Sequence, residues 1–275
     1  MIQFICFLTL ICTSLFSYDY DLAICAIFQN DAKYLPEWIE FHQRQGVEHF
    51  YLYNNRSEDN YEEILAPYIH ARVVDLYDWD YGYSTEQEWI PIQCGAYLDC
   101  VKKTKKTVKW IAFLDTDEFL FNPGFKDLKD VLKDYKHYTS IWAHWMFYGT
   151  SGVDKVPDGE KMINHLIWRA SEGNCTGKSI VRPKYVAKCL NPHFFIMKDG
   201  SVGVNEKKVK RSWDHIWDQP YIADVFRINH YWLRDRDFFL NVKIPRRQKW
   251  GHEIQSLLDL IDKHNDVYDP ILQDR

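Results

Sequence analysis

Two aspartates separated by one residue, Asp115 and Asp117, form the strongest chemical signal in the sequence. They come directly after the apolar run WIAFL at 110–114, which predicts a buried strand that ends at the first aspartate. A nucleoside diphosphate carries closely spaced anionic oxygens, and a hard divalent cation held by carboxylates can neutralise their charge. We therefore predict that both aspartates are catalytic and hold a divalent metal ion together with a nucleotide-sugar donor.

The same Asp-x-Asp motif also occurs in another class of enzyme and in ordinary turns. Haloacid-dehalogenase-type phosphatases place Asp-x-Asp at the end of a strand and use the first aspartate as a nucleophile. Their motif continues with Thr or Val where this sequence has Phe119, and it usually opens the domain, whereas Asp115 follows three strand–helix units. The simplest alternative is an acidic turn or a helix cap that binds no ligand. The buried strand before Asp115 favours the metal and donor site over both alternatives.

Polar side chains also follow two other predicted strands, at 22–28 and 47–53. Ligands of open parallel sheets bind beyond the carboxyl ends of the strands, where these side chains converge with Asp115. We predict that the following residues contact the nucleotide: Gln29, Asn30, Asp31, Asn54, Asn55, Ser57 and Asp59. The alternative for the segment after the second strand is an Asx-rich turn that needs no ligand.

Residues near the C-terminus extend the predicted site. His230 is a candidate third metal ligand, because imidazole commonly joins carboxylates around ions such as Mn²⁺. Lys243 and Arg246, with Arg247 beside them, can contact diphosphate oxygens. Spacing alone leaves an alternative open for each. His230 could be a core histidine whose hydrogen bonds are made within the protein, and the basic residues could form a surface patch.

The elements that must position these residues are predicted from hydrophobic periodicity. Apolar runs predict strands at 22–28, 47–53, 71–76 and 110–114. Helical spacing predicts helices at 34–41, capped by Asp31 and ended by Gly46, from 61 to just before Pro67, and at 87–105. This alternation predicts an α/β fold with a Rossmann-like, mainly parallel sheet flanked by helices.

The second half of the sequence is more irregular. Strands are expected at 140–148 and 179–186, and helical segments after Arg234 and His252. Cys175 and Cys189 could form a disulfide across a hairpin in an oxidising compartment. The sequence shows neither an internal repeat nor a clear linker, so we expect one continuous domain.

Composition excludes several classes of protein. The chain has 275 residues, enough for one large α/β domain, and its formal net charge of −5 lacks the basic excess typical of nucleic-acid-binding proteins. Aromatic residues make up 16% of the chain, with 11 Trp and 18 Tyr among them. A large core accounts for this content, and so does sugar recognition, because flat rings stack on pyranose faces.

The N-terminal segment 2–16 is an apolar run without Asp, Glu, Lys or Arg. It is shorter than the roughly 20 residues that a membrane-spanning helix requires. It fits the hydrophobic region of a signal peptide. We therefore assign 1–17 to a signal peptide or short signal-anchor. We expect a location in the secretory pathway or outside the cytoplasm, with membrane association through this segment if it is retained.

Seven segments of the sequence together resemble glycosyltransferase family 92. They are YLPEWIEFH at 34–42, GVEHFYLY at 46–53, WIAFLDTDEFL at 110–120, FYGTSG at 147–152, KSIVRP at 178–183, HFF at 193–195 and NHY at 229–231. The first block is also similar to the broader family-2-like transferases. The segment 147–152 is one residue longer than the family's Phe-Gly-Ser/Thr-x-Gly pattern. So many ordered matches are far more specific than the two aspartates alone.

This resemblance implies a GT-A fold and a metal-dependent transfer. The donor it implies is a UDP-sugar, with UDP-galactose the leading candidate, the metal is Mn²⁺ or another divalent cation, and the hexose passes to a glycan acceptor with inversion. Asp115 and Asp117 would coordinate the metal and the donor, and His230 would complete the metal shell. An inverting step requires a general base for the acceptor hydroxyl, for which Asp154 and Glu172 are the candidates.

The domain prediction follows from these assignments. We expect a single GT-A catalytic domain at 18–275, with a nucleotide-sugar-binding half at 18–120 and an acceptor-binding half at 121–275. A non-catalytic protein of the same fold that binds a glycan or a nucleotide sugar is the main alternative. The presence of Asp115, Asp117 and His230 together favours the enzyme.

Overall fold

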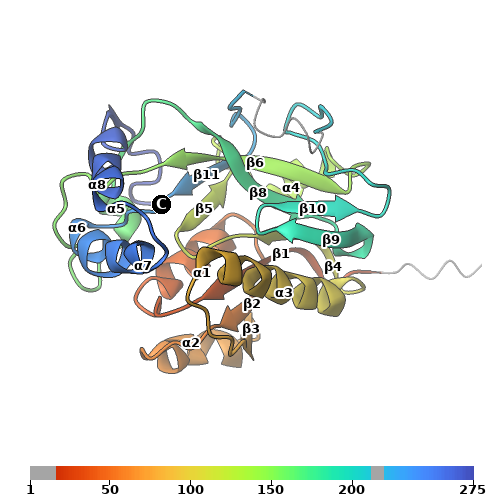
Figure 1. Ribbon diagram of the computed structural model, residues 1–275. Coiled ribbons are helices and arrows are strands. Elements are labelled where there is room, and N and C mark those ends of the chain that lie inside the picture. Colours follow the sequence, from red (N-terminus) through yellow and green to blue (C-terminus); the bar gives the residue numbers. More distant parts are fainter. Residues whose placement is uncertain (1–16, 212–219) are drawn as a thin grey trace, which may run out of the picture.

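An eight-stranded sheet runs through the part of the chain that the computed structural model describes, residues 17–211 and 220–275 (Figure 1). Its strands stand in the order β3-β2-β1-β4-β8-β6-β11-β5. Their bounds are β1 Tyr20–Phe28, β2 His49–Asn54, β3 Val74–Asp78, β4 Val108–Phe113, β5 Glu118–Phe121, β6 Ser140–Phe147, β8 Asn174–Val181 and β11 Arg227–His230. All of them run in one direction except β8 and β5, which are antiparallel to their neighbours. The predicted α/β fold with a mainly parallel sheet is confirmed.

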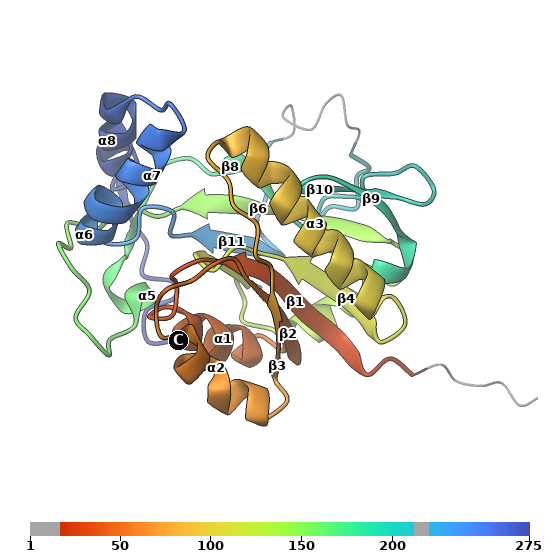
Figure 2. The ribbon, with the colours of Figure 1, turned by 60° about the horizontal axis from the view of Figure 1, so that its bottom comes forward.

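Helices cover both faces of this sheet. Figure 2 shows α1 and α2 on one side of the strands and α3 on the other, while α6, α7 and α8 group at one end of the molecule. The helices are α1 Leu35–Arg44, α2 Tyr61–His70, α3 Glu86–Thr104, α4 Leu128–Lys133, α5 Met162–His165, α6 Arg236–Phe238, α7 Ile244–Lys249 and α8 Ile254–Lys263. A π-helical segment, η3 Phe239–Lys243, joins α6 to α7. The smaller elements are the pair β7 Trp168–Arg169 and β12 Val267–Tyr268, the pair β9 Val186–Asn191 and β10 Phe194–Met197, and the 3₁₀ turn η1 Pro183–Tyr185.

The central strand β1 is apolar along most of its length because both of its faces are buried. Ile24 packs in the cluster that contains Trp38 of α1, and its neighbour Cys25 packs in the cluster that contains Tyr97 of α3. Successive side chains of a strand point to opposite faces of the sheet, so one continuous apolar run packs against the helices on both faces. The unbroken apolar pattern at 22–28 thus reflects a strand covered on both sides.

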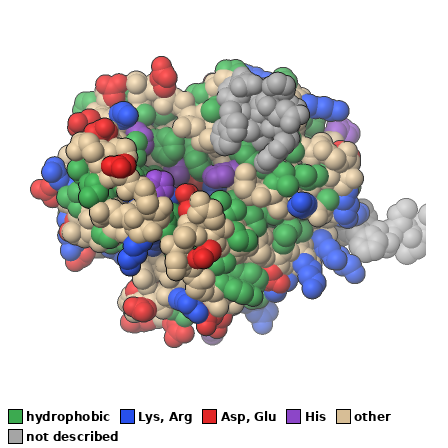
Figure 3. Space-filling view, viewed as in Figure 1, with side chains coloured by type: hydrophobic (Ala, Val, Ile, Leu, Met, Phe, Trp, Pro, Cys, Tyr) green, Lys and Arg blue, Asp and Glu red, His purple; other side chains and the backbone are tan. Residues whose placement is uncertain are grey.

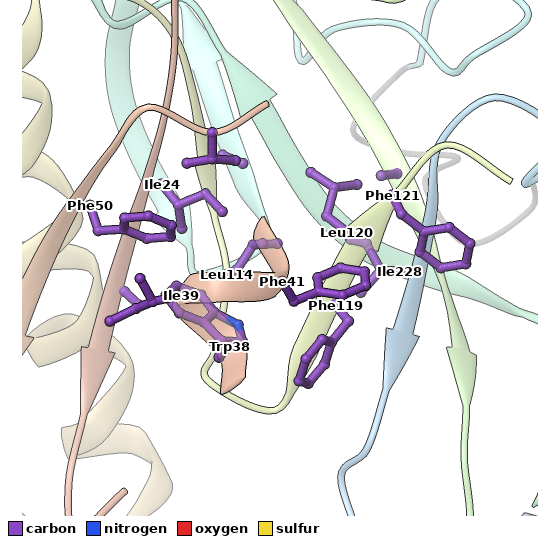
Figure 4. Packing of buried hydrophobic residues seen from close by; sticks show 14 of the residues in the cluster. Ile24, Trp38, Ile39, Phe41, Phe50, Leu114, Phe119, Leu120, Phe121 and Ile228 are labelled. Atoms are coloured by element: carbon purple, nitrogen blue, oxygen red, sulfur yellow. The ribbon is translucent and has the colours of Figure 1, made fainter. Parts of the chain in front are cut away.

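Helix α1 holds the start of β5 in place. Trp38 packs against Phe50 with ring centroids 5.5 Å apart, and Phe41 packs against Phe119 at 5.1 Å (Figure 4). The indole Nε1 of Trp38 also donates a hydrogen bond to the backbone oxygen of Glu118, at 2.8 Å. This contact fixes the chain immediately after the Asp115–Asp117 loop.

Helix boundaries differ from the prediction at two places. Gly46 does end α1, with φ of +94°, but Asp31 does not cap it: the N-cap residue is Tyr34, and no side chain caps the helix. The Asp31 carboxylate instead accepts a hydrogen bond from Thr116, at 2.7 Å. Pro67 lies inside α2 rather than after it, and the helix continues for three more residues although the proline cannot donate a backbone hydrogen bond.

The predicted strand at 179–186 is divided in the structure. Strand β8 ends at Val181, and Pro183 starts a 3₁₀ turn, because proline cannot donate to a strand ladder. Cys175 and Cys189 form no disulfide, since both are free thiols in the described chain. Among the described residues, none of the helices combines the length and apolar composition needed to cross a bilayer. The segment predicted as a signal peptide or anchor lies outside the described residues, apart from Ser17.

Candidate active site

The carboxyl ends of β1, β4 and β11 meet at one edge of the sheet, as the parallel arrangement requires. A cavity of about 130 Å³ lies at this edge. Nine of the residues predicted from the sequence line it: Gln29, Asn30, Asp31, Asp115, Asp117, His230, Lys243, Arg246 and Arg247. Residues more than 200 positions apart therefore share one cavity, although the sequence placed them in separate segments.

Backbone contacts fix the loop that carries the two aspartates. Glu118 Oε2 accepts a hydrogen bond from the backbone N–H of Asp115 at 2.9 Å, and the Glu118 N–H donates to the Asp115 oxygen at 3.1 Å. On the other side, the N–H of Tyr231 donates to the backbone oxygen of Asp117 at 2.8 Å. The register of β5 against β11 pairs Glu118 with His230. This pairing is what brings the predicted third ligand next to the loop.

Asp115 is held by three side chains that sequence reasoning missed. Gln93 Nε2 donates to its Oδ1 at 2.8 Å, Tyr97 lies 3.5 Å from the same atom, and Lys178 Nζ lies 2.9 Å from Oδ2. Burial alone would raise the pKa of Asp115, but the charge and hydrogen bond of Lys178, together with the charge of His230, lower the pKa below its ordinary value. Asp115 is therefore an ionised carboxylate with a fixed orientation at the cavity wall.

Asp117 and His230 lie in contact with one another at the wall of the cavity. His230 Nε2 lies 3.4 Å from Asp117 Oδ1, and Lys243 Nζ lies 3.3 Å from Asp117 Oδ2. Burial opposes ionisation of Asp117, but Lys243 and then His230 hold its pKa well below the ordinary value. Burial lowers the pKa of Lys243 to about 8 against the attraction of Asp117. The His230 ring stacks on Phe147, with centroids 5.0 Å apart, so its orientation is fixed by packing.

Asp31 connects the loop after β1 to the C-terminal segment. Arg234 Nη1 donates to Asp31 Oδ1 at 2.6 Å, and the Thr116 hydroxyl donates to Asp31 Oδ2 at 2.7 Å. The Arg234 guanidinium also lies over the ring of Tyr34, 3.9 Å from its centroid. Both carboxylate oxygens of Asp31 are thus engaged by the protein. Asp31 borders the cavity, but its contacts position the segment that carries Lys243.

The predicted nucleotide contacts after β2 have mostly structural partners. Asn54 Oδ1 accepts from the Ser57 N–H at 3.0 Å, Ser57 Oγ accepts from the Asn30 N–H at 2.9 Å, and Asp59 Oδ2 accepts from the Ala32 N–H at 2.8 Å. None of these three lines the cavity of Asp115. The turn alternative describes Asn54, Ser57 and Asp59 better, because their oxygens satisfy backbone donors of the neighbouring loop.

Asn55 differs from its neighbours because it borders an adjoining cavity of about 700 Å³. This second space shares Gln29, Tyr83 and Arg246 with the cavity of Asp115. The Asn55 amide donates to the backbone oxygens of Trp79 and Tyr81, at 2.7 and 2.9 Å, so its orientation is fixed. The adjoining cavity extends the site toward the carboxyl end of β2.

A third cavity, of about 630 Å³, adjoins the first at Asp115. It shares Gln93, Asp115 and His230 with the first, and Trp145 lies in its wall. Figure 3 shows a hollow in the middle of this face of the molecule, with histidine and hydrophobic side chains at its floor.

The two candidates for the general base lie elsewhere. Asp154 and Glu172 are exposed, and neither lines the cavity of Asp115 or the adjoining cavity that contains Trp145. The loop after β6 carries Asp154 away from the sheet edge, where its backbone oxygen accepts from Asp237 at 2.8 Å. The structure therefore does not support either residue as the base.

The donor set at the cavity fits a divalent cation shared with a ligand. Asp117 and His230 offer an ionised carboxylate and an imidazole nitrogen 3.4 Å apart. Glu118 Oε1 is buried nearby, 3.9 Å from His230 Nε2, and has no hydrogen-bond partner among the described residues. No group of three His, Cys, Asp or Glu side chains within those residues is spaced to hold a metal by itself. Two protein donors with open positions suit an ion that also binds phosphates.

The missed residues left only weak signals in the sequence. Lys178 is a charged residue shortly before the apolar end of a strand, and Gln93 is a polar residue four positions before the buried Tyr97 on the same helix. A buried charge requires a partner of opposite charge, so Lys178 indicated a nearby carboxylate, but the sequence did not show which one. Arg234 gave no comparable signal before its contact with Asp31 was seen.

A mainly parallel sheet whose carboxyl edge carries paired aspartates beside a histidine is the architecture of GT-A glycosyltransferases. The family model described as glycosyltransferase family 92 matches residues 20–244, and the chain belongs to this family. Membership excludes the haloacid-dehalogenase alternative.

Two curated relatives illustrate the similarity. A glycosyltransferase family 92 protein of Oryza sativa subsp. japonica is 31% identical over 264 residues, which cover 87% of this chain and 43% of the relative. The beta-1,4-galactosyltransferase galt-1 of Caenorhabditis elegans is 33% identical over 115 residues, 40% of this chain and 27% of the relative. The chain thus spans less than half the length of these relatives.

Solved structures show a more distant likeness. The crystal structure of S. aureus TarS 1–349 aligns with a TM-score of 0.46 at 12% identity, covering 88% of this chain and 70% of the other. The same protein in complex with UDP-GlcNAc aligns with a TM-score of 0.45 at 13% identity, covering 88% and 70%.

Proposed function

We propose that this chain transfers a hexose, with galactose favoured, from a UDP-sugar to a glycan acceptor in a metal-dependent, inverting reaction. The observation that carries the proposal is the Asp117–His230 pair, 3.4 Å apart in a cavity that Asp115 also lines. Membership in family 92 supports the transferase reaction. The preference for galactose rests on relatives named as galactosyltransferases, two of them from Arabidopsis thaliana.

Each residue of the site has a role in this reaction. Asp117 and His230 would hold the divalent cation, and Asp115 would orient the donor, because its own oxygens are already fixed by Gln93 and Lys178. When bound, the cation would neutralise the negative charge that grows on the departing diphosphate. Lys243 and Arg246, which border the same cavity, add positive charge for the diphosphate oxygens.

The nucleoside of the donor also has a place in this proposal. The adjoining cavity at Asn55 lies on the side of the carboxyl ends of β1 and β2 and would take the nucleoside.

We also propose that the chain acts in the secretory pathway or outside the cytoplasm, because its apolar N-terminal segment fits a signal sequence.

Calorimetry of UDP binding with and without Mn²⁺ tests the donor site. The wild-type protein should bind UDP at least tenfold more tightly with Mn²⁺ present, and Asp117→Asn should remove that difference. Asp130→Asn is the matched control, because Asp130 forms an exposed pair with Lys133 on α4 and its replacement should leave UDP binding unchanged. Equal UDP affinity with and without Mn²⁺ in the wild-type protein would overturn the donor-site assignment.

Turnover distinguishes the enzyme from a binding protein of the same fold. Release of the nucleoside diphosphate, UDP or GDP, from a panel of UDP-galactose, UDP-glucose, UDP-N-acetylglucosamine and GDP-mannose identifies the donor, and UDP-galactose should be hydrolysed fastest. Metal-dependent UDP binding without hydrolysis of any sugar in the panel would support the non-catalytic alternative.

A further inference from the structure

Exposed lysines from elements far apart in the sequence lie close together on one side of the molecule. Helix α3 contacts both η1 and β9, β9 pairs with β10, and Lys198 Nζ donates to the backbone oxygen of Lys184 at 2.7 Å. Figure 3 shows Lys and Arg side chains gathered at the right of the view, where Figure 1 places β9 and the end of α3. We use the name basic face for six exposed lysines of these elements: Lys102, Lys105, Lys106, Lys184, Lys188 and Lys198.

The charge of the basic face is not balanced by neighbouring carboxylates. Within residues 17–211 and 220–275, none of its six lysines forms an ion pair, whereas Lys103 pairs with Asp99 and Lys109 with Asp21 beside them. The acidic residue next to Lys198 is Asp199, whose Oδ1 accepts from the Ser201 N–H at 3.0 Å and from its hydroxyl at 2.7 Å. The chain as a whole has a net charge of −5, so this local excess of positive charge runs against its overall balance.

A solvated helix end accounts for only part of this charge. Cations are favourable near the C-terminus of a helix because of its dipole, which suits Lys102 to Lys106 at the end of α3. Lys184, Lys188 and Lys198 belong to other elements, and no helix dipole explains them. A surface with several unpaired cations attracts a polyanionic surface.

The basic face lies at the amino ends of β1 and β4. The backbone N–H groups of Asp19 and Tyr20 donate to the Thr107 oxygen, at 2.8 and 3.1 Å, so the start of β1 is fixed next to Lys106. The apolar segment 2–16 ends three residues before Asp19 in the sequence. Three residues of chain span at most about 11 Å. A bilayer that received this segment would therefore lie against the basic face.

We propose that the basic face docks on a lipid bilayer whose surface carries anionic phosphate headgroups. Lysine side chains are long and end in a charge, so they reach headgroups across a broad surface and need no pocket. Leu98 lies one helical turn before Lys102 on the same face of α3 and is 37% exposed, which places an apolar side chain beside the lysines. Cations with an apolar side chain among them suit the boundary between headgroups and acyl chains.

Docking in this orientation would hold the candidate active site away from the bilayer. Strand β1 has nine residues and leads from the basic face to the sheet edge that carries Asp31. At a rise of about 3.3 Å per residue, this strand is about 30 Å long. The bilayer and the cavity of Asp115 would lie at its opposite ends, so the cavity would face the aqueous side. None of the six lysines borders that cavity or the two that adjoin it, so the inference does not depend on the proposed function.

Vesicle flotation of the full chain tests the docking. The probes are vesicles of phosphatidylcholine alone and vesicles with about two parts phosphatidylcholine to one part phosphatidylserine. The apolar segment 2–16 can enter both kinds, so the ratio of the two partition coefficients reports on charge. At low salt the wild-type protein should prefer the anionic vesicles at least a hundredfold. In about 1 M NaCl, where the Debye length is about 3 Å, this preference should fall below twofold.

Two double variants remove charge from separate elements of the basic face. Lys105→Gln/Lys106→Gln changes the end of α3, and Lys184→Gln/Lys188→Gln changes η1 and β9. A lysine near an anionic bilayer contributes about fivefold to partitioning. Each double variant should therefore lower the preference for anionic vesicles at least tenfold. Far-UV circular dichroism should be unchanged, because all four side chains are exposed.

The matched control removes the same charge from the other end of the molecule. Lys155 and Lys263 are exposed and form no ion pair with a residue that the structure describes. Lys155 follows Asp154, whose backbone oxygen accepts from Asp237 of α6, and Lys263 ends α8. Lys155→Gln/Lys263→Gln should keep the vesicle preference within twofold of the wild type.

Three outcomes would overturn the proposal. The wild-type protein could partition equally on neutral and anionic vesicles. The control could lose as much preference as the test variants, or only one of the two test variants could lose it, either of which would contradict docking through this one face. The wild-type protein could also bind soluble polygalacturonate without preferring anionic vesicles, which would assign the basic face to an acidic polymer. Failure of metal-dependent UDP binding would overturn the proposed function and leave this result unaffected.

Discussion

Lys178 Nζ lies 2.9 Å from Asp115 Oδ2 and 3.5 Å from Glu118 Oε2, and its side chain is fully shielded from solvent. Burial would lower the pKa of Lys178, but Asp115 and Glu118 together raise it above its ordinary value. A cation placed between two carboxylates cancels their repulsion at the floor of the site. The ammonium group of Lys178 therefore lets acidic residues cluster there before any ligand binds.

Replacing this lysine should destabilise the fold. Lys178→Met leaves the buried Glu118 and the partly exposed Asp115 without their cation, and removing one partner of a buried pair costs about 3 kcal/mol. Urea unfolding monitored by circular dichroism measures the loss. Lys207→Met is the control, because Lys207 and Asp224 form an exposed pair that contributes less than about 1 kcal/mol. Similar losses in the two variants would show that Lys178 does not hold the aspartate loop together.

Arg234 lines the donor cavity and should affect UDP binding through its contacts with Asp31 and Thr116. Its guanidinium bonds to Asp31 through Nη1 and lies 3.4 Å from the Thr116 hydroxyl through Nη2, and it stacks over Tyr34. A lysine cannot reproduce this planar fork, so Arg234→Lys should cost about 2 kcal/mol of stability. It should also weaken UDP binding severalfold, because the segment with Lys243 loses its anchor.

The control for this variant lies two residues away. Arg236 is exposed on α6, so Arg236→Lys should change neither the urea midpoint nor the UDP affinity measured by calorimetry. An Arg234→Lys variant with wild-type stability and affinity would show that the Asp31 contact does not position the segment.

The sequence predicted those residues of the candidate site that directly follow buried strands. Asp115 and Asp117 directly follow a buried strand, and Gln29 to Asp31 follow another, so the rule that parallel strands end at one edge was sufficient to bring them together. The paired strands β5 and β11 then added His230. These residues line the cavity because the direction of the strands, rather than the detailed packing of side chains, determines their position.

The remaining features depend on contacts that one sequence does not reveal. Asn54, Ser57 and Asp59 have the residue types of a ligand site, but their oxygens satisfy backbone N–H groups of the neighbouring loop. Asp31 was predicted as a helix cap and instead pairs with Arg234, far along the chain. Short polar side chains bond equally well to a backbone or to a ligand, so the choice is made by tertiary structure.

Gly177 is expected to tolerate no side chain. A Cβ at this position would lie 1.8 Å from the backbone oxygen of Ala143, at the register shift where β6 passes β8. Two strands would have to separate, so Gly177→Ala should lower the free energy of unfolding by about 3 kcal/mol. It should also weaken UDP binding, because the next residue, Lys178, moves with the strand.

A second glycine separates this steric effect from backbone strain. Gly152 has φ of +71° and open space around a Cβ, so Gly152→Ala should cost only about 1–2 kcal/mol and leave UDP binding unchanged. Chemical denaturation of both variants measures the difference. A Gly177→Ala protein as stable as Gly152→Ala would mean that the two strands can separate easily.

His42 should make the stability of the protein depend on pH. Its Nε2 accepts a hydrogen bond from the Leu120 N–H at 3.1 Å, so the proton lies on Nδ1, which donates to the Trp38 oxygen at 2.8 Å. Burial lowers the pKa of His42 to about 3. An unfolded histidine has a pKa of about 6.5, so the unfolded chain binds more protons between these two values. Stability from this site is therefore complete above pH 6.5 and is lost as the pH falls toward 3.

The predicted loss for His42 is about 2 kcal/mol between pH 7 and pH 5, since each pH unit in this window costs about 1.4 kcal/mol. His42→Gln removes the titrating group, so the variant should be less stable than the wild type at pH 7 by an amount that shrinks by about 2 kcal/mol at pH 5. His70→Gln, at an exposed position of α2, should follow the wild-type curve at both values. Urea unfolding at pH 7, 6 and 5 measures all three proteins. Parallel curves for the wild type and His42→Gln would show that His42 is protonated in the folded protein, which would require Nε2 to give up the Leu120 hydrogen bond.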